Sequence, residues 1–230
     1  MGQKISVGSI IKFGKYPQKV KTISETVQRG LFITRYEQVK RTVPDETAYP
    51  IEWIVLEYNK RNNCALVISH YGLDAHCFDE SKYRGWEKSE IRTWLNSTFL
   101  NTAFTASEQA AIMTTTVSTP DYHGNSGGSD TEDKIWLLSR EEAKMYFTSD
   151  GARKAVPTEY AVAQGAWQSG GNKLDGVGCC WWWLRLPGSI SSYASYVYSG
   201  GSIYHNYNVN RSDGSVRPAF WLNLDSAAIN

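Results

Sequence analysis

The sequence predicts a mixed α+β fold in a single domain. The chain has 230 residues, which is enough for one large domain with a sizeable core, and 41% of them are hydrophobic. Strand-like apolar runs and short helical segments follow one another without a regular strand–helix repeat, a pattern typical of α+β proteins. The last third of the chain differs from the rest in being rich in tryptophan, tyrosine and serine.

The first third is expected to form strands. Residues 9–18 (SIIKFGKYPQ) predict a strand that ends in a Tyr-Pro turn. IEWIVLEY (51–58) and NCALVISHY (63–71) predict two more strands, joined by a hairpin turn at NKRNN (59–63). Residues 19–50 are more charged, with a β-rich middle (LFITRY), and indicate either an inserted hairpin or a loop.

Two short helices follow. Ser89 is expected to cap a helix over residues 89–101, in which apolar residues recur at helical spacing. The second helix is expected to begin at Thr105, which stands three residues before Glu108. This is the spacing of a capping box, in which the side chain of each residue bonds the backbone of the other.

The rest of the chain is expected to contain two more strands and two more short helices. A Gly/Ser/Asp-rich loop precedes a predicted strand over KIWLL (134–138), and Ser139 with Glu142 forms a second predicted capping box directly after it. Residues 157–164 indicate one more short helix that begins at a proline. Residues 216–224 (VRPAFWLNL) predict a closing strand.

Charge and hydropathy exclude several classes of protein. The net charge of +1 argues against a nucleic-acid-binding surface, which needs a basic excess. The apolar runs are too short for a transmembrane helix, and the N-terminal residues lack the apolar core of a signal peptide. We therefore expect no nucleic-acid or membrane partner. The location stays open between a phage particle, the cytoplasm and the cell surface, with a cytoplasmic or phage-associated location as the default.

No metal or cofactor is expected. Two clusters contain metal-ligating residue types, but the first matches no zinc spacing and the second lacks the alternation of an EF-hand loop. The clusters are His70, Asp74, His76, Cys77 and Asp79, and Asp121, Asp130, Glu132 and Asp133. A structural or solvated role is the favoured interpretation of both.

The sequence also nominates no catalytic centre. The cysteines are Cys64, Cys77, Cys179 and Cys180, and none forms a CxxC pair, so buried reduced thiols are expected. GxSxG, Walker A and HExxH motifs are lacking as well. We therefore expect a protein that is not an enzyme.

Residues 189–213 have an unusual composition. This stretch holds five tyrosines, seven serines and three asparagines, and no lysine or glutamate. One interpretation is a β-meander whose exposed side chains happen to be polar. Another is a binding surface, because tyrosine offers a large contact area at small entropic cost, and serine, glycine and asparagine adapt their hydrogen bonds.

The binding-surface interpretation divides the stretch into anchors and surface residues. Ala194, Val197, Gly201, Ile203 and Val209 are expected to anchor it to the core. The predicted ligand-binding residues lie between these anchors: Ser189, Ser191, Ser192, Tyr193, Ser195, Tyr196, Tyr198, Ser199, Tyr204, His205, Asn206, Tyr207, Asn208, Asn210, Arg211, Ser212 and Asp213. All of these residue types can be reached from an AAY asparagine codon by changing only its adenines, whereas lysine, glutamate, glutamine, methionine and tryptophan cannot.

Several segments carry a family resemblance. CCWWWLRLPG (179–188), ASYV (194–197), GGSI (200–203) and GSVRPAFWL (214–222) resemble the C-terminal WWLRSPG…GVRPA signature of an uncharacterised bacterial and phage domain family. Ordered segments upstream resemble it too, so that the resemblance covers most of the chain outside residues 19–50. Leu186 and Ser215 depart from the family pattern, which has Ser and Gly there.

The resemblance implies a C-type lectin-like fold, shared with formylglycine-generating enzymes and with the variable proteins of diversity-generating retroelements. In those elements an error-prone reverse transcriptase diversifies the 3′ coding segment at adenines, and a constant scaffold displays the hypervariable region. The resemblance thus implies a receptor-like protein that binds an unknown protein or glycan, in an oligomeric state left open. The alternatives are a carbohydrate-binding module and, more remotely, a formylglycine-generating type of enzyme using Cys179 or Cys180.

The frame around this surface is expected to follow strand geometry. Trp181, Trp182 and Trp183 should alternate between core and surface, because successive side chains of a strand point to opposite faces. Arg185 and Arg217 are expected to pair with carboxylates and so to brace the loops.

Overall fold

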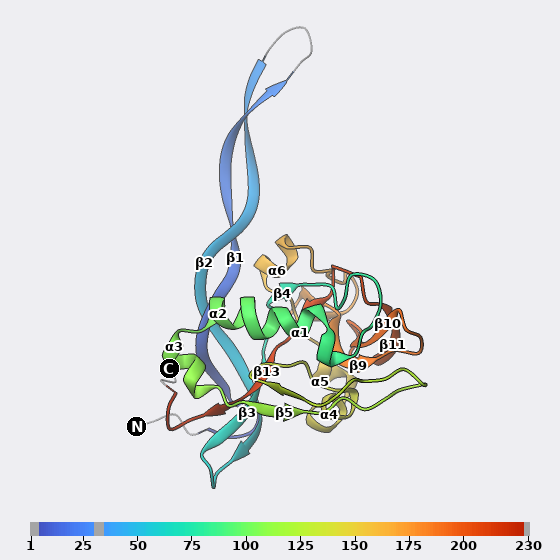
Figure 1. Ribbon diagram of the computed structural model, residues 1–230. Helices are drawn as coiled ribbons and strands as arrows, with labels where there is room; N and C mark the ends of the chain where they lie inside the picture. Colours follow the sequence, from blue (N-terminus) through green and yellow to red (C-terminus); the bar gives the residue numbers. More distant parts are fainter. Residues whose placement is uncertain (1–4, 30–34, 228–230) are drawn as a thin grey trace.

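Two sheets organise the chain, and one of them extends into a long arm (Figure 1). The computed structural model describes residues 5–29 and 35–227. Apart from the arm, the elements form one strand-rich α+β body around a continuous hydrophobic core. In this part of the chain no helix is both long and apolar enough to cross a membrane.

The first sheet has four antiparallel strands in the order β1-β2-β3-β13. Its strands are β1 (Ile10–Arg29), β2 (Arg35–Asn59), β3 (Cys64–Ser69) and β13 (Ala219–Asn223). The predicted hairpin turn lies between β2 and β3, and the predicted closing strand is β13, which pairs with β3. The C-terminal part of the chain thus returns to the sheet that its N-terminal part begins.

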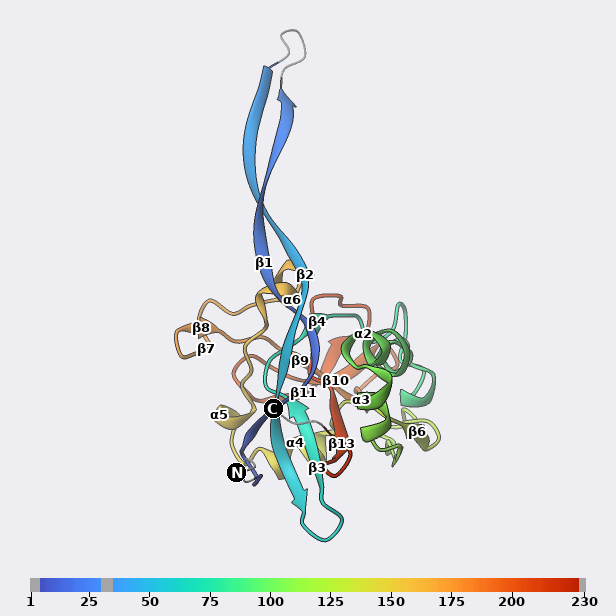
Figure 2. The same ribbon diagram turned by 90° about the vertical axis from the view of Figure 1, so that its left-hand side faces the viewer.

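Residues 19–29 and 35–50 form the paired strands of a hairpin, the first of the two predicted alternatives. From Lys19 paired with Asp45 to Arg29 paired with Arg35, β1 and β2 continue as an antiparallel ribbon beyond the body (Figures 1 and 2). The predicted end of the strand at the Tyr-Pro turn is wrong. Pro17 lies at a register shift, and the strand continues, because β1 is an edge strand and its outer side needs no N–H donor. Most of the predicted β-rich middle of this segment (LFITRY, 31–36) lies outside the described residues, namely residues 31–34.

The second sheet has five strands in the order β11-β10-β9-β12-β4. Its strands are β4 (Asp74–Ala75), β9 (Trp182–Pro187), β10 (Tyr193–Val197), β11 (Ile203–Asn208) and β12 (Ser215–Val216). Only the β12–β9 pair is parallel among these described pairings. Two small hairpins complete the strands: β5 (Thr115–Val117) with β6 (Thr131–Asp133), and β7 (Lys173–Leu174) with β8 (Val177–Gly178).

Short helices cover the sheets, and three of them begin where the sequence predicts. Ser89 caps the first helical segment, and both predicted capping boxes are present, at Thr105–Glu108 and Ser139–Glu142. The helix predicted to begin at Pro157 begins two residues later, because the Thr158 side chain caps it. The helices are α1 (Glu90–Trp94), a π-helical turn (Leu95–Phe99), α2 (Leu100–Ala103), α3 (Ala106–Ala111), α4 (Arg140–Tyr146), α5 (Asp150–Arg153) and α6 (Glu159–Ala163), with a 3₁₀ turn at Trp86–Lys88.

Two predictions about strands are wrong. Residues 134–138 form no strand, and only Trp136 makes a bridge, to Ala219. Trp181, Trp182 and Trp183 do not alternate between core and surface, because all three are buried. The strand β9 lies in the middle of its sheet and is covered on both faces, so period-two alternation does not expose either side.

The two arginines of the C-terminal motifs brace the core in different ways. The Arg185 guanidinium pairs with the Glu142 carboxylate, which confirms the predicted pairing with a carboxylate. It also donates to the carbonyls of Ser118 and Leu137. Arg217 instead donates to the Ser69 carbonyl, so its predicted carboxylate partner is wrong. Its guanidinium lies 4.8 Å from the Trp182 ring centroid, and complete burial lowers its pKa to about 10.

Candidate ligand-binding surface

The edge of the second sheet carries the most regular array of exposed polar side chains in residues 189–213. Strand β11 pairs with β10 on one side only, and its other side is the sheet edge. Tyr204, Asn206 and Asn208 point outward and are exposed, whereas Ile203, His205 and Tyr207 between them are half-buried. The period-two geometry of an edge strand therefore presents one row of side chains to solvent.

The predicted ligand-binding residues fall into three groups by exposure. The exposed group is Ser191, Tyr198, Tyr204, Asn206, Asn208, Asn210, Arg211 and Ser212. The half-buried group is Ser189, Ser192, Tyr193, His205, Tyr207 and Asp213. The buried group is Ser195, Tyr196 and Ser199.

For Ser195, Tyr196 and Ser199 the prediction of a surface role is wrong. The Ser195 hydroxyl donates to the Pro187 carbonyl across 3.0 Å, and the Ser199 hydroxyl accepts from the Asn172 amide across 2.9 Å. The Tyr196 ring is only 7% exposed, because it packs between rings of the core and of β11. These side chains hold the frame together.

Aromatic rings connect the core to this surface without a break. Neighbouring ring centroids lie 4.5 Å apart for Trp181 and Tyr207, 4.7 Å for Tyr207 and Tyr196, and 5.7 Å for Tyr196 and Tyr204. The series continues at 6.2 Å from Tyr204 to Tyr198. Such contacts fix ring orientation, so the outer tyrosines stand on a rigid base.

The sequence reasoning missed Trp167, which completes the aromatic part of the surface. Its ring is 37% exposed and lies 6.3 Å from Tyr198, which is 41% exposed. The loop after α6 holds it there, where the Trp167 amide donates to the Asp213 carbonyl across 3.0 Å. A tryptophan among glycine and polar residues (GAWQSGG, 165–171) is the signal that could have nominated it.

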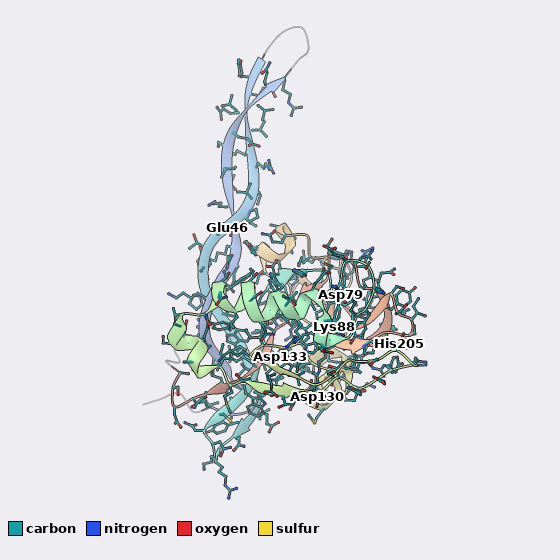
Figure 3. The ribbon with its side chains drawn as sticks, viewed as in Figure 1. Glu46, Asp79, Lys88, Asp130, Asp133 and His205 are labelled. Atoms are coloured by element: carbon teal, nitrogen blue, oxygen red, sulfur yellow. The ribbon has the colours of Figure 1, made fainter. Side chains whose placement is uncertain are left out.

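A second cluster missed by the sequence reasoning surrounds His205. Tyr122 and His123, from the loop between β5 and β6, lie 5.2 and 5.9 Å from the His205 ring. Burial, followed by Arg140 and His123, lowers the pKa of His205, so its neutral form is favoured. Figure 3 shows His205 at the outer edge of the body, on the side away from the arm. Neutral imidazole and phenol rings there can donate and accept hydrogen bonds.

A shallow hollow borders this surface. Its lining comes from residues 82–88, from the 124–129 loop and from Ser191. Arg84 in this lining is already paired with the Asp79 and Glu90 carboxylates, at 3.0 and 2.5 Å. The hollow therefore extends the polar surface. The positive charge of Arg84 in its lining is already balanced by the two carboxylates.

The C-terminal end of the surface is held by an ion pair. The Arg211 guanidinium contacts both carboxylate oxygens of Asp213, at 2.8 and 2.6 Å, and lies 5.4 Å from the Tyr207 ring. Arg211 is exposed and Asp213 half-buried. The pair is available for contact with a polar ligand while it also fixes the turn after β11.

The cysteines have no features of a reactive centre. All four are free thiols, and Cys179 and Cys180 are buried. Burial raises the pKa of both, that of Cys180 to about 11, whereas a nucleophilic cysteine needs a lowered pKa. Within residues 5–29 and 35–227 no three His, Cys, Asp or Glu side chains lie close enough together to hold a metal ion.

Comparison with known proteins gives one match. No curated protein and no solved structure matches the chain. One family model, described as "Domain of unknown function (DUF6273)", matches residues 62–224. This range runs from the β2–β3 turn to the end of β13 and includes the aromatic surface, whereas the arm lies outside it. Because the match spans more than half of the sequence, the chain belongs to the DUF6273 family.

Proposed function

We propose that this chain is a ligand-binding variable protein of a diversity-generating retroelement, built on a C-type lectin-like scaffold. Its binding surface would consist of the exposed and half-buried side chains of residues 189–213 together with Trp167, Tyr122 and His123. The role is binding and not catalysis, and the buried thiols with raised pKa support this.

The observation that carries the proposal is the separation of frame from surface within one short stretch. Ala194, Val197 and Val209 are fully buried, while the neighbouring Tyr204 and Asn206 are exposed. Because an exposed side chain on an edge strand contributes little to folding, such positions can be exchanged without loss of the fold. A diversified receptor needs this division.

The nature of the exposed side chains also supports binding. Tyr198 and Tyr204 are rigid amphipathic rings set among asparagine and serine, the mixture typical of binding surfaces that recognise proteins. The ring series beneath them limits the entropy lost when a ligand binds.

The flanking DNA tests the retroelement directly. We expect a near-copy of the 3′ coding segment, differing at adenines, beside a reverse transcriptase gene. Sibling genes should vary at Tyr198, Tyr204 and Asn206 and keep Ala194 and Val197. A source genome without such a copy, in which sibling genes share the same exposed tyrosines, would overturn the proposal.

A displayed library tests the binding surface itself. Randomising the exposed Tyr204, Asn206, Asn208 and Asn210 should give mostly folded proteins, from which binders to new protein targets can be selected. A matched library of equal size at the buried frame positions of β9 should give mostly unfolded protein. Equal folding of the two libraries would contradict the proposed division.

Carbohydrate binding is the second candidate, and the neighbouring rings of Trp167 and Tyr198 favour it. These rings are nearly parallel, at 24°, and both are partly exposed, as is suitable for stacking on sugar faces. A glycan array distinguishes the candidates. One shared sugar ligand among sibling proteins, lost on Trp167→Ala, would support the carbohydrate-binding module.

A further inference from the structure

Arg140 lies at the margin of the binding surface without a carboxylate partner. Its guanidinium carbon lies 4.1 Å from the centroid of the Tyr122 ring. None of the ion pairs in the described part of the chain includes Arg140, and its buried Nη1 atom has no hydrogen-bond partner there. Because a guanidinium carries five N–H donors, this side chain keeps donors for a group from outside the chain.

The carboxylates beside Arg140 in the sequence do not neutralise it. Arg140 is the first residue of α4, and Glu141 and Glu142 follow it. The Glu142 carboxylate pairs with Arg185 and accepts from the Ser139 N–H across 2.7 Å. Glu141 is exposed, and residues one apart on a helix do not face each other. The helix that carries Arg140 therefore leaves its charge uncompensated.

Two imidazole rings lie close to this guanidinium. The rings of His123 and His205 are stacked at 16°, and Tyr122 contacts both of them. Burial, followed by Arg140 and His123, lowers the pKa of His205, so the charged neighbours that contribute are both basic. We call Arg140, Tyr122, His123 and His205 the Arg140 cluster. It gathers N–H and O–H donors and contains no carboxylate acceptor.

The turn that carries Tyr122 and His123 is held in place. Tyr122 and Asn125 exchange two backbone hydrogen bonds of 2.9 Å, and the Asn125 side chain donates to the Gly188 carbonyl across 3.0 Å. Between them His123 and Gly124 have φ values of 48° and 76°, as a tight two-residue turn requires. A positive φ is unfavourable for histidine, and residues held in such conformations cluster at ligand-binding sites.

We propose that the Arg140 cluster is an anion-binding subsite of the surface and that it binds an acidic side chain of a protein ligand. A guanidinium binds a carboxylate through two parallel N–H···O bonds, which are stronger than bonds between neutral groups. The Tyr122 ring already packs against Arg140, which favours an acidic side chain over a sugar that needs a free ring for stacking. That a protein supplies the carboxylate rests on the proposed function, whereas the subsite itself does not.

Most of the cluster lies outside the stretch proposed to vary. Arg140, Tyr122 and His123 come from α4 and from the loop between β5 and β6, and His205 alone belongs to residues 189–213. Variation of that stretch would exchange His205 and its neighbours and leave the guanidinium in place. Sibling proteins would then share a preference for acidic ligands, while the exposed row of β11 would select among such ligands.

Nuclear magnetic resonance of the full-length chain tests the subsite with a defined probe. The probe is an acetylated tetra-aspartate amide, and the matching tetra-asparagine amide is its neutral control, both at constant ionic strength. We expect the acidic peptide to shift the imidazole signals of His123 and His205 saturably, with a dissociation constant of about 1 mM or tighter. The neutral peptide should cause no such shift.

Substitutions assign the binding to the guanidinium. Arg140→Gln should weaken binding of the acidic peptide at least about tenfold, because a charge-assisted bond is lost. Arg140→Lys keeps the charge without the planar fork and should fall between the two. His123→Asn tolerates the positive φ, removes the imidazole and should weaken binding about threefold. The matched control is Arg61→Gln, an exposed arginine at the β2–β3 turn, which should bind as the wild type does.

Three results would overturn the proposal. The first is a wild-type chain that binds neither peptide or both equally. The second is an Arg140→Gln variant that circular dichroism shows to be folded and that keeps the wild-type affinity for the acidic peptide. The third is tighter binding of N-acetylneuraminic acid, a sugar carboxylate, than of the peptide, which would assign the subsite to an acidic glycan.

The outcome can be separated from that of the proposed function. The displayed library described above should give fewer binders to an acidic protein target when it is built on Arg140→Gln. Equal numbers of binders from both scaffolds would remove the subsite and leave the diversified surface. Specific binding of the acidic peptide by a chain whose source genome holds no near-copy of the 3′ segment would do the reverse.

Discussion

Strands β10 and β11 are neighbours with similar composition and opposite environments. Both are rich in tyrosine and small polar residues, and they form one hairpin. In β10 every residue after Tyr193 is buried, whereas in β11 exposed and half-buried residues alternate. The cause is position, since β10 lies between β9 and β11 and β11 is the edge of the sheet.

The comparison teaches that a tyrosine-rich composition does not by itself define a binding surface. Tyr196 and Tyr204 are cross-strand partners with ring centroids 5.7 Å apart. Tyr196 is packed under neighbouring rings, and Tyr204 covers it from outside. Only the outer residue of such a pair can change its side chain at small cost to the fold.

Replacing the inner ring should have the largest effect. Tyr196→Ser leaves a cavity among Trp181, Tyr204 and Tyr207, and we expect it to lower the free energy of unfolding by about 3 kcal/mol. Tyr204→Ser is the matched control on β11 and should cost below about 1 kcal/mol. Urea unfolding followed by tryptophan fluorescence measures both, and equal losses would remove the distinction between the strands.

Removing a buried hydroxyl should have an intermediate effect. Ser195→Ala deletes the hydrogen bond to the Pro187 carbonyl, and we expect a loss of about 1 kcal/mol. Asn206→Ala on β11 is the control and should change the free energy of unfolding by less than about 0.5 kcal/mol. A larger loss for Asn206→Ala than for Ser195→Ala would contradict this ranking.

High pH should weaken the inner position selectively. Burial, followed by the neighbouring tyrosines, raises the pKa of Tyr196 from 10.0 to about 12. Its contribution to stability is complete below pH 10 and is lost as the pH rises towards 12, because the unfolded chain releases this proton first. Tyr196→Phe should therefore make stability fall less steeply over this range.

Thermal melts at intervals between pH 9 and 12 compare the wild type with Tyr196→Phe. Other buried tyrosines contribute to the slope in both proteins, so only the difference between the two is informative. Identical slopes for the wild type and Tyr196→Phe would contradict the effect of burial.

Changing the outer row should have the smallest effect on stability. A variant with serine at Tyr204, Asn206 and Asn208 should melt within roughly 3 °C of the wild type, because these side chains are exposed on an edge strand. Differential scanning calorimetry measures the shift. A fall as large as that of Tyr196→Ser would mean that the row supports the fold and cannot vary freely.

Much of the local structure could be predicted from sequence. Ser89, the two capping boxes and the β2–β3 turn act within a few residues of themselves, so their patterns are legible in the chain. The predicted binding residues were correct in exposure for Tyr198 and most of β11. Whether they bind a ligand stays a prediction.

The rest could not be predicted, because it depends on contacts between distant segments. Trp167, Tyr122 and His123 join the surface from loops far from it in the chain. Residues 134–138 look like a strand, but they pair at Trp136 alone. Periodicity shows which residues share a face and leaves open what covers that face.

By itself the sequence determined the α+β class, the capped helix starts and the concentration of tyrosine, serine and asparagine near the C-terminus. Tertiary structure alone decided that β10 is interior and β11 an edge, and therefore that Tyr196 supports the frame while Tyr204 faces solvent. It also decided that the outer part of the β1–β2 arm extends beyond the body, without another element of the described chain beside it. The physical reason is that burial is a property of neighbours in space, whereas capping and turn formation are properties of neighbours in sequence.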